Sequence, residues 1–372
     1  MSDNIRRYHA VCHHLCQNHP EALGSKRLQG HLRTLAGMVA GIVASERTSL
    51  PRLALKTPDS TKAQSRAKRF ERFLRNESTT FETFYEPFAR KLVSDLSKKG
   101  APLLIVFDSS SVGRGCVALM ASVLYRKRAL PLAWTVRKGK KGHFSGADHR
   151  LLLRRIRQII PEGDTAIFLG DGEFDSVGLQ KALDKTGFDY VCRTALSTLV
   201  EDRSGEVFPI GELRPFPEER YASLQGAAVT GQRYGPIQVV FWHEEGHRSG
   251  VPLVTNLELA EEAIRFYKRR FQIETLFSDQ KSRGFHIHKS HISAPERLMR
   301  LLMAASLAYL WMIRLGVESL QRGWYRQFHR TSRVDLGLFQ LGCRLLDYML
   351  NHEWTLLVAF SLPPPDPSQI VR

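Results

Sequence analysis

The chain has 372 residues, of which 43% are hydrophobic and 24% charged, a composition that is ordinary for a soluble globular protein. Its 54 Lys and Arg residues outnumber its 37 Asp and Glu residues, which gives a formal net charge of +17 and a pI near 9.9. Such an excess indicates a polyanionic partner. Nucleic acid is the leading candidate, and an anionic membrane is the competitor.

No segment of the sequence predicts a membrane span or a secretion signal. The longest apolar run, Leu301–Ile313, lies between Arg300 and Arg314 and is too short to cross a bilayer, so we expect a buried core helix there. The stretch Met1–His14 lacks the apolar centre of a signal peptide. The five cysteines are scattered along the chain, which fits a reducing cytoplasm.

Residues 1–95 are expected to be helical and densely basic. One short span, Ser60–Ser78, contains Lys62, Arg66, Lys68, Arg69, Arg72 and Arg75. Basic side chains on a helix suit docking on duplex DNA, where phosphate contacts fix the position of a protein. The alternative is a solvated basic face. The segment Cys12–His19 contains zinc-ligand residue types, but no second cluster follows at finger spacing, so we expect an amphipathic helix without a metal.

From Ala101 onward, apolar runs that predict strands alternate with amphipathic runs that predict helices. In chain order we expect a strand at 102–108, a hairpin at 116–137, a helix at 149–160, a strand at 165–171, a helix at 176–187 and a strand at 189–193. This alternation predicts an α/β architecture with a mixed sheet. Residues 197–256 predict a β insertion, and a long apolar helix, a basic aromatic tail and a loose end follow Pro295.

Two aspartates share a position in this pattern. Asp108 ends the apolar run before "SSS", and Asp171 ends the run before "GEF". Functional groups of open α/β sheets gather at the carboxyl ends of the strands, so these two acids are candidates for a common site.

A third acid, Glu274, lies in the stretch "YKRRFQIETLFSDQK", which has no Pro or Gly and predicts one continuous helix at 267–281. On such a helix Tyr267, Arg270, Glu274 and Lys281 fall within roughly 60° of one another around the axis. Taken alone, the stripe favours an exposed charged face with a salt-bridge pattern.

Three carboxylates that converge at a sheet edge repel one another unless a divalent cation holds them. Mg²⁺ is the natural partner because it binds a few carboxylates and fills its shell with water and phosphate oxygens. Two such ions about 4 Å apart can activate a water or a 3′-hydroxyl and stabilise the leaving oxygen. Arg270 and Lys281 would then neutralise phosphates beside the scissile bond.

The sequence resembles the transposases of the IS4 group, which have an RNase H-like catalytic domain and an Asp-Asp-Glu triad. Their signature of Tyr, two residues, Arg, three residues, Glu, six residues and Lys is complete as Tyr267, Arg270, Glu274 and Lys281. The segments "FDSSS", "GDGEFDS" and "DYVCR", the last with Tyr190 and Arg193, resemble the blocks around the two aspartates and the strand that follows. The resemblance covers roughly 101–289.

This resemblance implies cut-and-paste DNA transposition in a bacterial cytoplasm. Asp108, Asp171 and Glu274 would bind two Mg²⁺ ions, for which Mn²⁺ can substitute. Water would nick one strand at a terminal inverted repeat, and the freed 3′-hydroxyl would attack the opposite strand to give a hairpin end. The hairpin would be reopened, and the 3′-hydroxyl freed again would finally join target DNA. Two transposases would pair the two ends as a homodimer.

The remaining candidates are DNA contacts. The resemblance implies that Tyr267, Arg270 and Lys281 hold phosphates near the cleaved end, with Arg193 close by. Some relatives stack a flipped base on a tryptophan of the β insertion, for which Trp242 is the candidate; a core tryptophan is the alternative. The glycine-containing loop 136–146 brings Lys138, Lys140 and Lys141, which either follow DNA or form a solvated loop.

The expected fold is an RNase H-like mixed-sheet catalytic core with a β-rich insertion, an all-helical N-terminal domain and a helical C-terminal region. Its parts are the DNA-binding domain (1–95), the first part of the core (96–196), the insertion (197–256), the second part with the glutamate helix (257–320) and a C-terminal region that is a candidate for dimerisation (321–372). Two rivals stay open: a nuclease of the same fold that cuts without joining, and a domesticated DNA-binding protein without chemistry.

Overall fold

Helices form the N-terminal quarter of the computed structural model, which describes residues 1–98, 100–142, 144–216, 218–243, 250–330 and 334–364. These helices are α1 (Asp3–Gln17), α2 (Lys26–Ser45), α3 (Leu50–Lys56), α4 (Ala63–Arg75), α5 (Phe81–Phe84) and α6 (Glu86–Ser97). The central helix α2 is buried from Thr34 to Ile42. A Cβ at Gly41 would lie 3.1 Å from the carbonyl oxygen of Leu53, so this glycine lets α3 pack closely against α2.

A single ten-stranded sheet runs through the rest of the molecule in the order β3-β2-β1-β4-β5-β10-β9-β8-β6-β7. The strands are β1 (Leu103–Val112), β2 (Cys116–Tyr125), β3 (Arg128–Lys138), β4 (Ala166–Gly170), β5 (Asp189–Arg193), β6 (Leu199–Glu201), β7 (Val207–Pro209), β8 (Tyr221–Val229), β9 (Tyr234–Trp242) and β10 (Val251–Thr255). Strand β4 is parallel to both β1 and β5, and the other pairs are antiparallel. The predicted mixed sheet is therefore confirmed.

The first predicted strand is longer than expected. Strand β1 does not end at Asp108 but continues to Val112, because Ser109–Val112 pair with β2 in the antiparallel ladder. The parallel ladder with β4, in contrast, ends at Val106. Asp108 therefore lies within one ladder and just beyond the end of the other.

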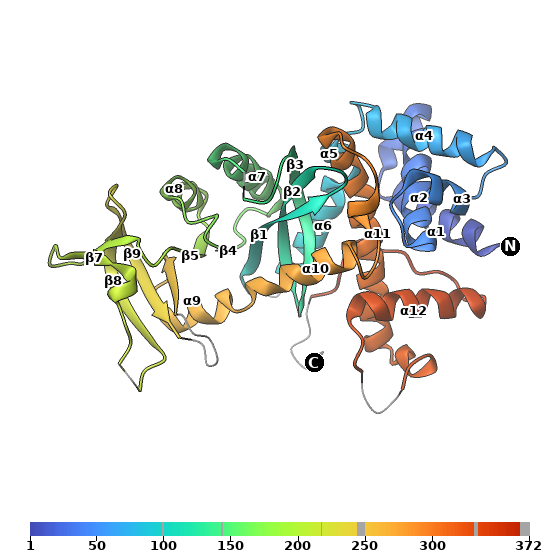
Figure 1. Cartoon of the computed structure of the whole chain (residues 1–372). Helices are drawn as coiled ribbons and strands as arrows, with labels where there is room; N and C mark the ends of the chain where they lie inside the picture. Colours follow the sequence, from blue (N-terminus) through green and yellow to red (C-terminus); the bar gives the residue numbers. More distant parts are fainter. Residues whose placement is uncertain (99, 143, 217, 244–249, 331–333, 365–372) are drawn as a thin grey trace.

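Helices flank the central strands, with α7 and α8 on one side and α9 and α10 on the other in Figure 1. Their bounds are α7 (Gly146–Ile159), α8 (Val177–Thr186), α9 (Ala260–Tyr267) and α10 (Ile273–Gln280). Helix α7 begins with a capping box, in which Ser145 accepts the backbone N–H of Asp148 and the Asp148 carboxylate accepts the N–H of Ser145. Both predicted helices of the 149–187 region are confirmed.

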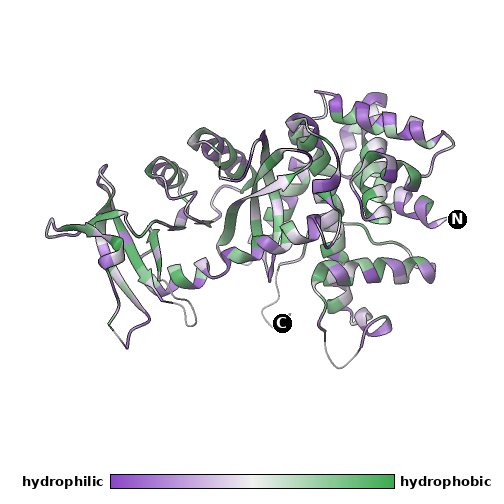
Figure 2. Cartoon of the chain, in the orientation of Figure 1, coloured by the Kyte–Doolittle hydropathy of each residue, from purple (hydrophilic) through white to green (hydrophobic). Residues whose placement is uncertain are grey.

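The long apolar helix α11 (Pro295–Gln321) packs between the sheet and the N-terminal helices and is largely hydrophobic in Figure 2. Among the described residues it is the one helix that is long and apolar enough to cross a membrane by length and composition, and 83% of its most apolar window is buried inside the protein. The helix is longer than the apolar run Leu301–Ile313 from which it was predicted, and its burial confirms the predicted core helix.

Helix α12 (Leu338–Asn351) crosses α11 at very close range. A Cβ at Gly316 would lie 2.0 Å from the carbonyl oxygen of Leu338, and one at Gly342 would lie 1.8 Å from that of Met312. Only residues without a side chain fit at this crossing. Residues 331–333 of the predicted basic tail and 365–372 of the predicted loose end lie outside the described residues.

The distal strands form an excursion that starts and ends at the same place in the sheet. The chain leaves β5 at Arg193 and returns along β10, which pairs with β5. The N–H of Thr194 donates to the carbonyl oxygen of Pro252 at 3.0 Å, so entry and exit are hydrogen-bonded neighbours. Strands β6–β9 occupy the end of the molecule opposite the N-terminal helices (Figure 1).

Candidate active site

The sheet aligns the two candidate aspartates. Val106 of β1 is paired with Leu169 of β4 in the parallel ladder, and Asp108 and Asp171 each follow two residues later. Asp108 lies within β1 and Asp171 is the first residue after β4, and the two carboxylates are close enough for the charge of Asp171 to raise the pKa of Asp108. The structure therefore brings Asp108 and Asp171 together.

Burial raises the pKa of Asp108, and the nearby Asp171 carboxylate raises it further. Three groups act in the opposite direction: the backbone N–H of Ser109, which donates to Asp108 Oδ1 at 2.6 Å, and the positive charges of Lys141 and Arg270. The ionised pair of aspartates is thus held at an energetic cost, which a bound cation would offset.

Asp171 is placed by a tight turn at the end of β4. The N–H of Phe174 donates to the Asp171 carbonyl at 2.9 Å, and the N–H of Glu173 donates to its Oδ1 at 3.1 Å. A Cβ at Gly170 would lie 2.7 Å from the Cβ of Phe174, so the glycine allows the buried ring to fold back beneath the turn. The Asp171 side chain remains 34% exposed at the surface.

The predicted continuous helix at 267–281 is wrong in its middle. Helix α9 ends at Tyr267, a 3₁₀ turn covers Arg270–Gln272, and α10 starts at Ile273. The backbone stays right-handed, but the hydrogen bond from the N–H of Gln272 to the carbonyl of Arg269 spans three residues instead of four, which tightens this turn.

Tyr267 and Arg270 reach the aspartates from this turn. Arg270 Nη1 lies 3.8 Å from Asp171 Oδ2, and the guanidinium carbon lies 5.7 Å from the ring centre of Tyr267. Both residues are buried, with 8% and 2% of their surfaces exposed. Burial raises the pKa of Tyr267, whereas Arg270 and Arg193 lower it, which places Arg193 at the end of β5 beside them.

Lys281 and Lys141 lie close to each other and to Asp108. The Nζ atoms of both lysines lie 5.9 Å from the ring centre of Phe277. Burial lowers the pKa of Lys281, Lys141 lowers it further, and Asp108 raises it. Lys141 and Lys140 belong to the exposed loop after β3, and the exposed Lys138 is the last residue of that strand. Nothing in the sequence pairs this loop with the glutamate segment.

Glu274 is exposed in the first turn of α10, a helix that contacts β1 and β3. Within the described ranges, no group of three or more His, Cys, Asp or Glu side chains is arranged so that it could hold a metal ion. Asp108 and Asp171 fit a divalent cation through their hard carboxylate oxygens and their proximity. The structure does not add Glu274 to them.

One further acid near Asp171 was not expected at the site. Asp175 is partly buried, its Oδ2 accepts the hydroxyl of Thr194 at 2.8 Å, and burial raises its pKa, with a smaller contribution from the charge of Asp171. Its place four residues after Asp171 is the only signal in the sequence, and that spacing is typical of surface acids as well.

Trp242 ends β9 and is only 5% exposed. It pairs with Tyr221 of β8 and Val251 of β10, and Lys268 Nζ lies 4.6 Å from its ring centre. These contacts match the core tryptophan that was the alternative for this residue.

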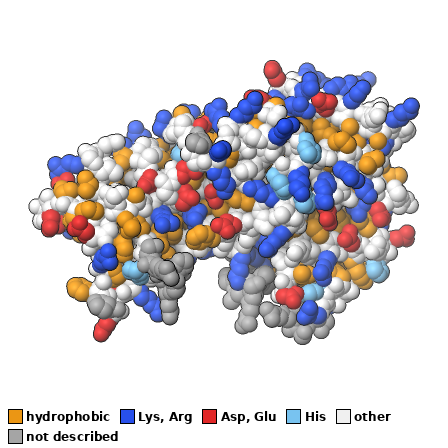
Figure 3. Space-filling view, viewed as in Figure 1, with side chains coloured by type: hydrophobic (Ala, Val, Ile, Leu, Met, Phe, Trp, Pro, Cys, Tyr) orange, Lys and Arg blue, Asp and Glu red, His pale blue; other side chains and the backbone are white. Residues whose placement is uncertain are grey.

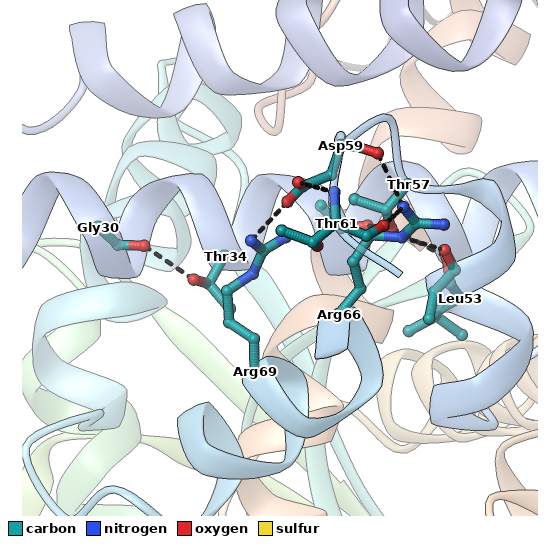
Figure 4. Close-up of polar contacts among 10 residues, drawn as sticks. Gly30, Thr34, Leu53, Thr57, Asp59, Thr61, Arg66 and Arg69 are labelled. Carbon is teal, nitrogen blue, oxygen red and sulfur yellow. Dashed lines mark hydrogen bonds and ion pairs between the residues drawn. The ribbon is translucent and has the colours of Figure 1, made fainter. Parts of the chain in front are cut away.

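The basic residues of α4 divide into two groups. Arg66 donates hydrogen bonds to the carbonyl oxygens of Ala54, Asp59 and Thr61, and Arg69 forms an ion pair with Asp59 at 2.6 Å (Figure 4). These two side chains bind the loop before α4. Lys62, Lys68 and Arg72 are exposed, and Lys and Arg side chains line the surface over this region in Figure 3.

Replacing Arg66 by Ala should lower the free energy of unfolding by about 2 kcal/mol, because three carbonyl oxygens lose a charged donor. Urea denaturation measures this change. Arg72→Ala, on the exposed face of the same helix, is the matched control and should change stability by less than about 0.5 kcal/mol. Equal effects of the two substitutions would contradict the structural role of Arg66.

Comparisons with known proteins give a family match and a similar solved structure. The family model described as "Transposase DDE domain" matches residues 75–311. A cryo-EM structure of a piggyBac transposase synaptic complex with hairpin DNA is similar at 12% sequence identity and a TM-score of 0.45, and the alignment covers 95% of this chain and 81% of that chain. A search of curated proteins gives no match.

Proposed function

Because the chain belongs to the DDE transposase domain family and is therefore a DNA-cutting and strand-transferring enzyme, we propose that it is the transposase of an insertion sequence of the IS4 group. It cuts at the terminal inverted repeats, passes through a hairpin intermediate and joins the 3′ ends to target DNA. The catalytic core is of the RNase H type. The Tyr267, Arg270, Glu274 and Lys281 series, with the spacing of that group, supports this assignment.

The observation that supports this function most directly is the proximity of Asp108 and Asp171 just beyond the end of the parallel ladder. These residues would hold the divalent cations, with Glu274 as the expected third ligand. Two bound Mg²⁺ ions, or Mn²⁺ in their place, supply the activation of a water or 3′-hydroxyl and the stabilisation of the leaving oxygen.

The positive groups around the aspartates position the DNA strand. Arg270 lies beside Asp171 and also acts on Asp108, and Lys281 and Lys141 lie close to Asp108. A phosphate between them would be neutralised, because Arg and Lys donate charge-assisted hydrogen bonds to phosphate oxygens. Tyr267 and Arg193 complete this phosphate site, and Trp242 is the candidate to stabilise the hairpin.

The proposed transposase binds duplex DNA and assembles with a second copy of itself. Duplex DNA of the element ends is bound by the helical domain at 1–95, through the exposed residues of α4, and by the lysines of the loop after β3. Two copies assemble with two paired ends in the bacterial cytoplasm, and the C-terminal region at 321–372 is the candidate for dimer contacts. The net charge of +17 supports a DNA partner over a neutral one.

Incubation of the protein with Mg²⁺, duplexes that end in the inverted repeats flanking its gene, and a supercoiled target plasmid should give joined products. Joining requires a free 3′-hydroxyl at the element end, so duplexes that end at the repeat with a 3′-dideoxy nucleotide form the matched control and should be bound but not joined. Duplexes in which flanking DNA follows the repeat should be both cut and joined. Cleavage without any joined product would favour the nuclease, and binding without cleavage would favour the domesticated DNA-binding protein.

A further inference from the structure

Two histidines lie together in the loop that follows the glutamate helix. His286 and His288 have ring centres 5.8 Å apart, and the second lies in the short 3₁₀ helix Ile287–Lys289. The Nδ1 atoms of both rings are buried and have no hydrogen-bond partner among the described residues. Neither histidine is a candidate metal ligand or part of the signature of the glutamate segment.

The backbone holds this pair between the N-terminal helices and the candidate active site. The N–H of His286 donates to the carbonyl oxygen of Lys281 at 2.9 Å. Its own carbonyl oxygen accepts the hydroxyl of Thr48, which lies between α2 and α3, at 3.3 Å. The N–H of Gly113 at the end of β1 donates to the carbonyl oxygen of Ile287 at 3.3 Å. The pair is thus fixed by three separate parts of the chain.

The charges that face the two rings are positive. Burial lowers the pKa of His286, and so do Arg47, Lys289 and His288. Burial also lowers the pKa of His288, together with Lys289 and Lys281. Among the described residues, every charge that shifts either pKa is therefore a cation.

Two of these cations have charged neighbours of their own. Lys281 lies close enough to Lys141 and to Asp108, at the candidate active site, for their charges to shift its pKa. Arg47 lines an open hollow of about 460 Å³ on the helical region. The other lining residues are Ala44, Ser45, Glu46, Arg52, Leu55 and Lys56. Glu46 is the one acid in this lining, against three bases. Figure 3 shows Lys and Arg side chains, with histidines among them, gathered over the middle of the molecule between the sheet and the N-terminal helices.

We propose that His286 and His288 form a phosphate-binding subsite on the path of the DNA between the N-terminal helices and Asp108, and that they take up protons when DNA occupies it. Rings that face only cations stay neutral in the free protein, and a phosphate reverses that balance because it stabilises the imidazolium form. This inference rests on the proposed action on DNA.

The sign of the pH dependence follows from this exchange. The pKa of each histidine lies below its ordinary value in the free protein and rises when a phosphate is bound. DNA affinity therefore increases as the pH falls through the raised pKa of the complex and levels off below the lowered pKa of the free protein. Each pKa unit between the two states corresponds to about a tenfold change in affinity.

Fluorescence anisotropy with a labelled duplex, without divalent metal and at constant ionic strength, measures this linkage. For the full chain we expect the Kd to rise at least about tenfold between pH 6 and pH 8. The double variant His286→Asn/His288→Asn should show a nearly flat profile, and Asn is chosen because it tolerates the positive φ of His286. The exposed His9→Asn on α1 is the matched control and should keep the parent profile.

The variant His288→Arg separates charge from structure. A permanent guanidinium should hold the Kd at pH 8 close to the parent value at pH 6, whereas simple damage to the loop would weaken binding at every pH. An unchanged pH profile in the double variant, or weak binding by His288→Arg at pH 8, would overturn the proposal. The response must persist in excess inorganic phosphate; its loss there would assign the subsite to free phosphate instead.

The two proposals fail in different ways. Strand transfer without pH-linked binding would leave the transposase assignment standing and remove the histidine subsite. Binding linked to pH through the histidines, without cleavage or joining, would leave the subsite and remove the assignment to an insertion sequence.

Discussion

Substitution of Asp108 by Asn should reduce DNA cleavage and joining by at least about a thousandfold, because cation-assisted stabilisation of the transition state contributes several kcal/mol and each 1.4 kcal/mol is tenfold in rate. Asp171→Asn should have the same effect, since the two carboxylates are neighbours in the candidate site. Gel assays with end-labelled duplexes and Mg²⁺ measure both steps.

Stability should change in the opposite sense. The pKa of Asp108 is raised in the folded protein, mainly by burial, so the folded state binds a proton more readily than the unfolded state. That stability is therefore lost as the pH rises through the folded-state pKa. A neutral Asn removes this cost and can still accept the N–H of Ser109, so the Tm of the variant at pH 7 should be no lower than that of the parent.

Binding of a divalent cation gives a test that does not depend on activity. Mg²⁺ or Mn²⁺ should raise the Tm of the parent and leave that of Asp108→Asn unchanged, because a ligand that binds only the folded state stabilises it. Glu162→Gln, at an exposed position in the loop before β4, is the matched control and should behave as the parent in both assays. Full cleavage by Asp108→Asn would place the chemistry elsewhere.

The second large effect is expected at the ion pair that joins the glutamate helix α10 to the start of β3. Arg128 at the start of β3 contacts Asp279 of α10 at 2.8 Å, and their side chains are 17% and 6% exposed. A Cβ at Gly337 would lie 1.8 Å from the guanidinium of Arg128, so the surroundings leave little room for relaxation. The pair fixes α10, which carries Glu274 and leads to Lys281, against the sheet.

Asp279→Asn should lower the free energy of unfolding by about 3–5 kcal/mol, since it leaves a buried guanidinium without its partner. Because the parent loses stability as Asp279 gives up its proton and the Asn variant has no such group, this loss should be smaller above about pH 6 than below about pH 4. Arg128→Met should cost less, because the isolated carboxyl group can become neutral by taking up a proton. Urea denaturation at several pH values distinguishes the two variants.

The pKa of Asp279 determines how the stability of the parent protein depends on pH. Burial raises its pKa to about 6, although Arg128 and Arg283 lower it. The folded state therefore holds a proton on Asp279 that the unfolded state has lost, and stability from this group falls as the pH rises from about 4 to about 6. In Arg128→Met the pKa rises further, so its loss of stability should shrink as the pH is lowered toward 6.

A matched control comes from an exposed pair on α9. Arg265 and Glu262 lie 2.6 Å apart with side chains 64% and 41% exposed, so Arg265→Ala should change stability by less than about 1 kcal/mol. DNA cleavage should also fall in Asp279→Asn, because α10 loses the ion pair that holds it against β3. If Asp279→Asn proves as mild as Arg265→Ala, the pair does not anchor the helix.

Local patterns were sufficient for the core of the fold. The strand at 189–193 is found with the predicted bounds, and the alternation of strands and helices predicted the mixed sheet. The approach of Asp108 to Asp171 followed from the rule that acids at the carboxyl ends of adjacent strands meet. These features depend on the period of the side chains, which a sequence displays directly.

The features that were missed depend on partners far away in the chain. Strand β1 continues past Asp108 because β2 pairs with its serines, and Arg66 points inward because loop carbonyls need a donor. Lys141 joins the site through the ring of Phe277, which no local pattern signals. The 3₁₀ turn at Arg270–Gln272 was missed because its residues are as good helix formers as their neighbours.

Because Thr194 and Pro252 are hydrogen-bonded, the strands beyond β5 form an arm that leaves the central strands and returns to them at the same place. Residues added to or removed from the outer part of this arm change how far the molecule reaches, while Asp171 on one side and Tyr267 on the other keep their spacing. The length of the arm can therefore change during evolution without a change in the arrangement of the candidate active site. Shortening the arm at its tip offers an engineering route to a smaller enzyme with the same catalytic face.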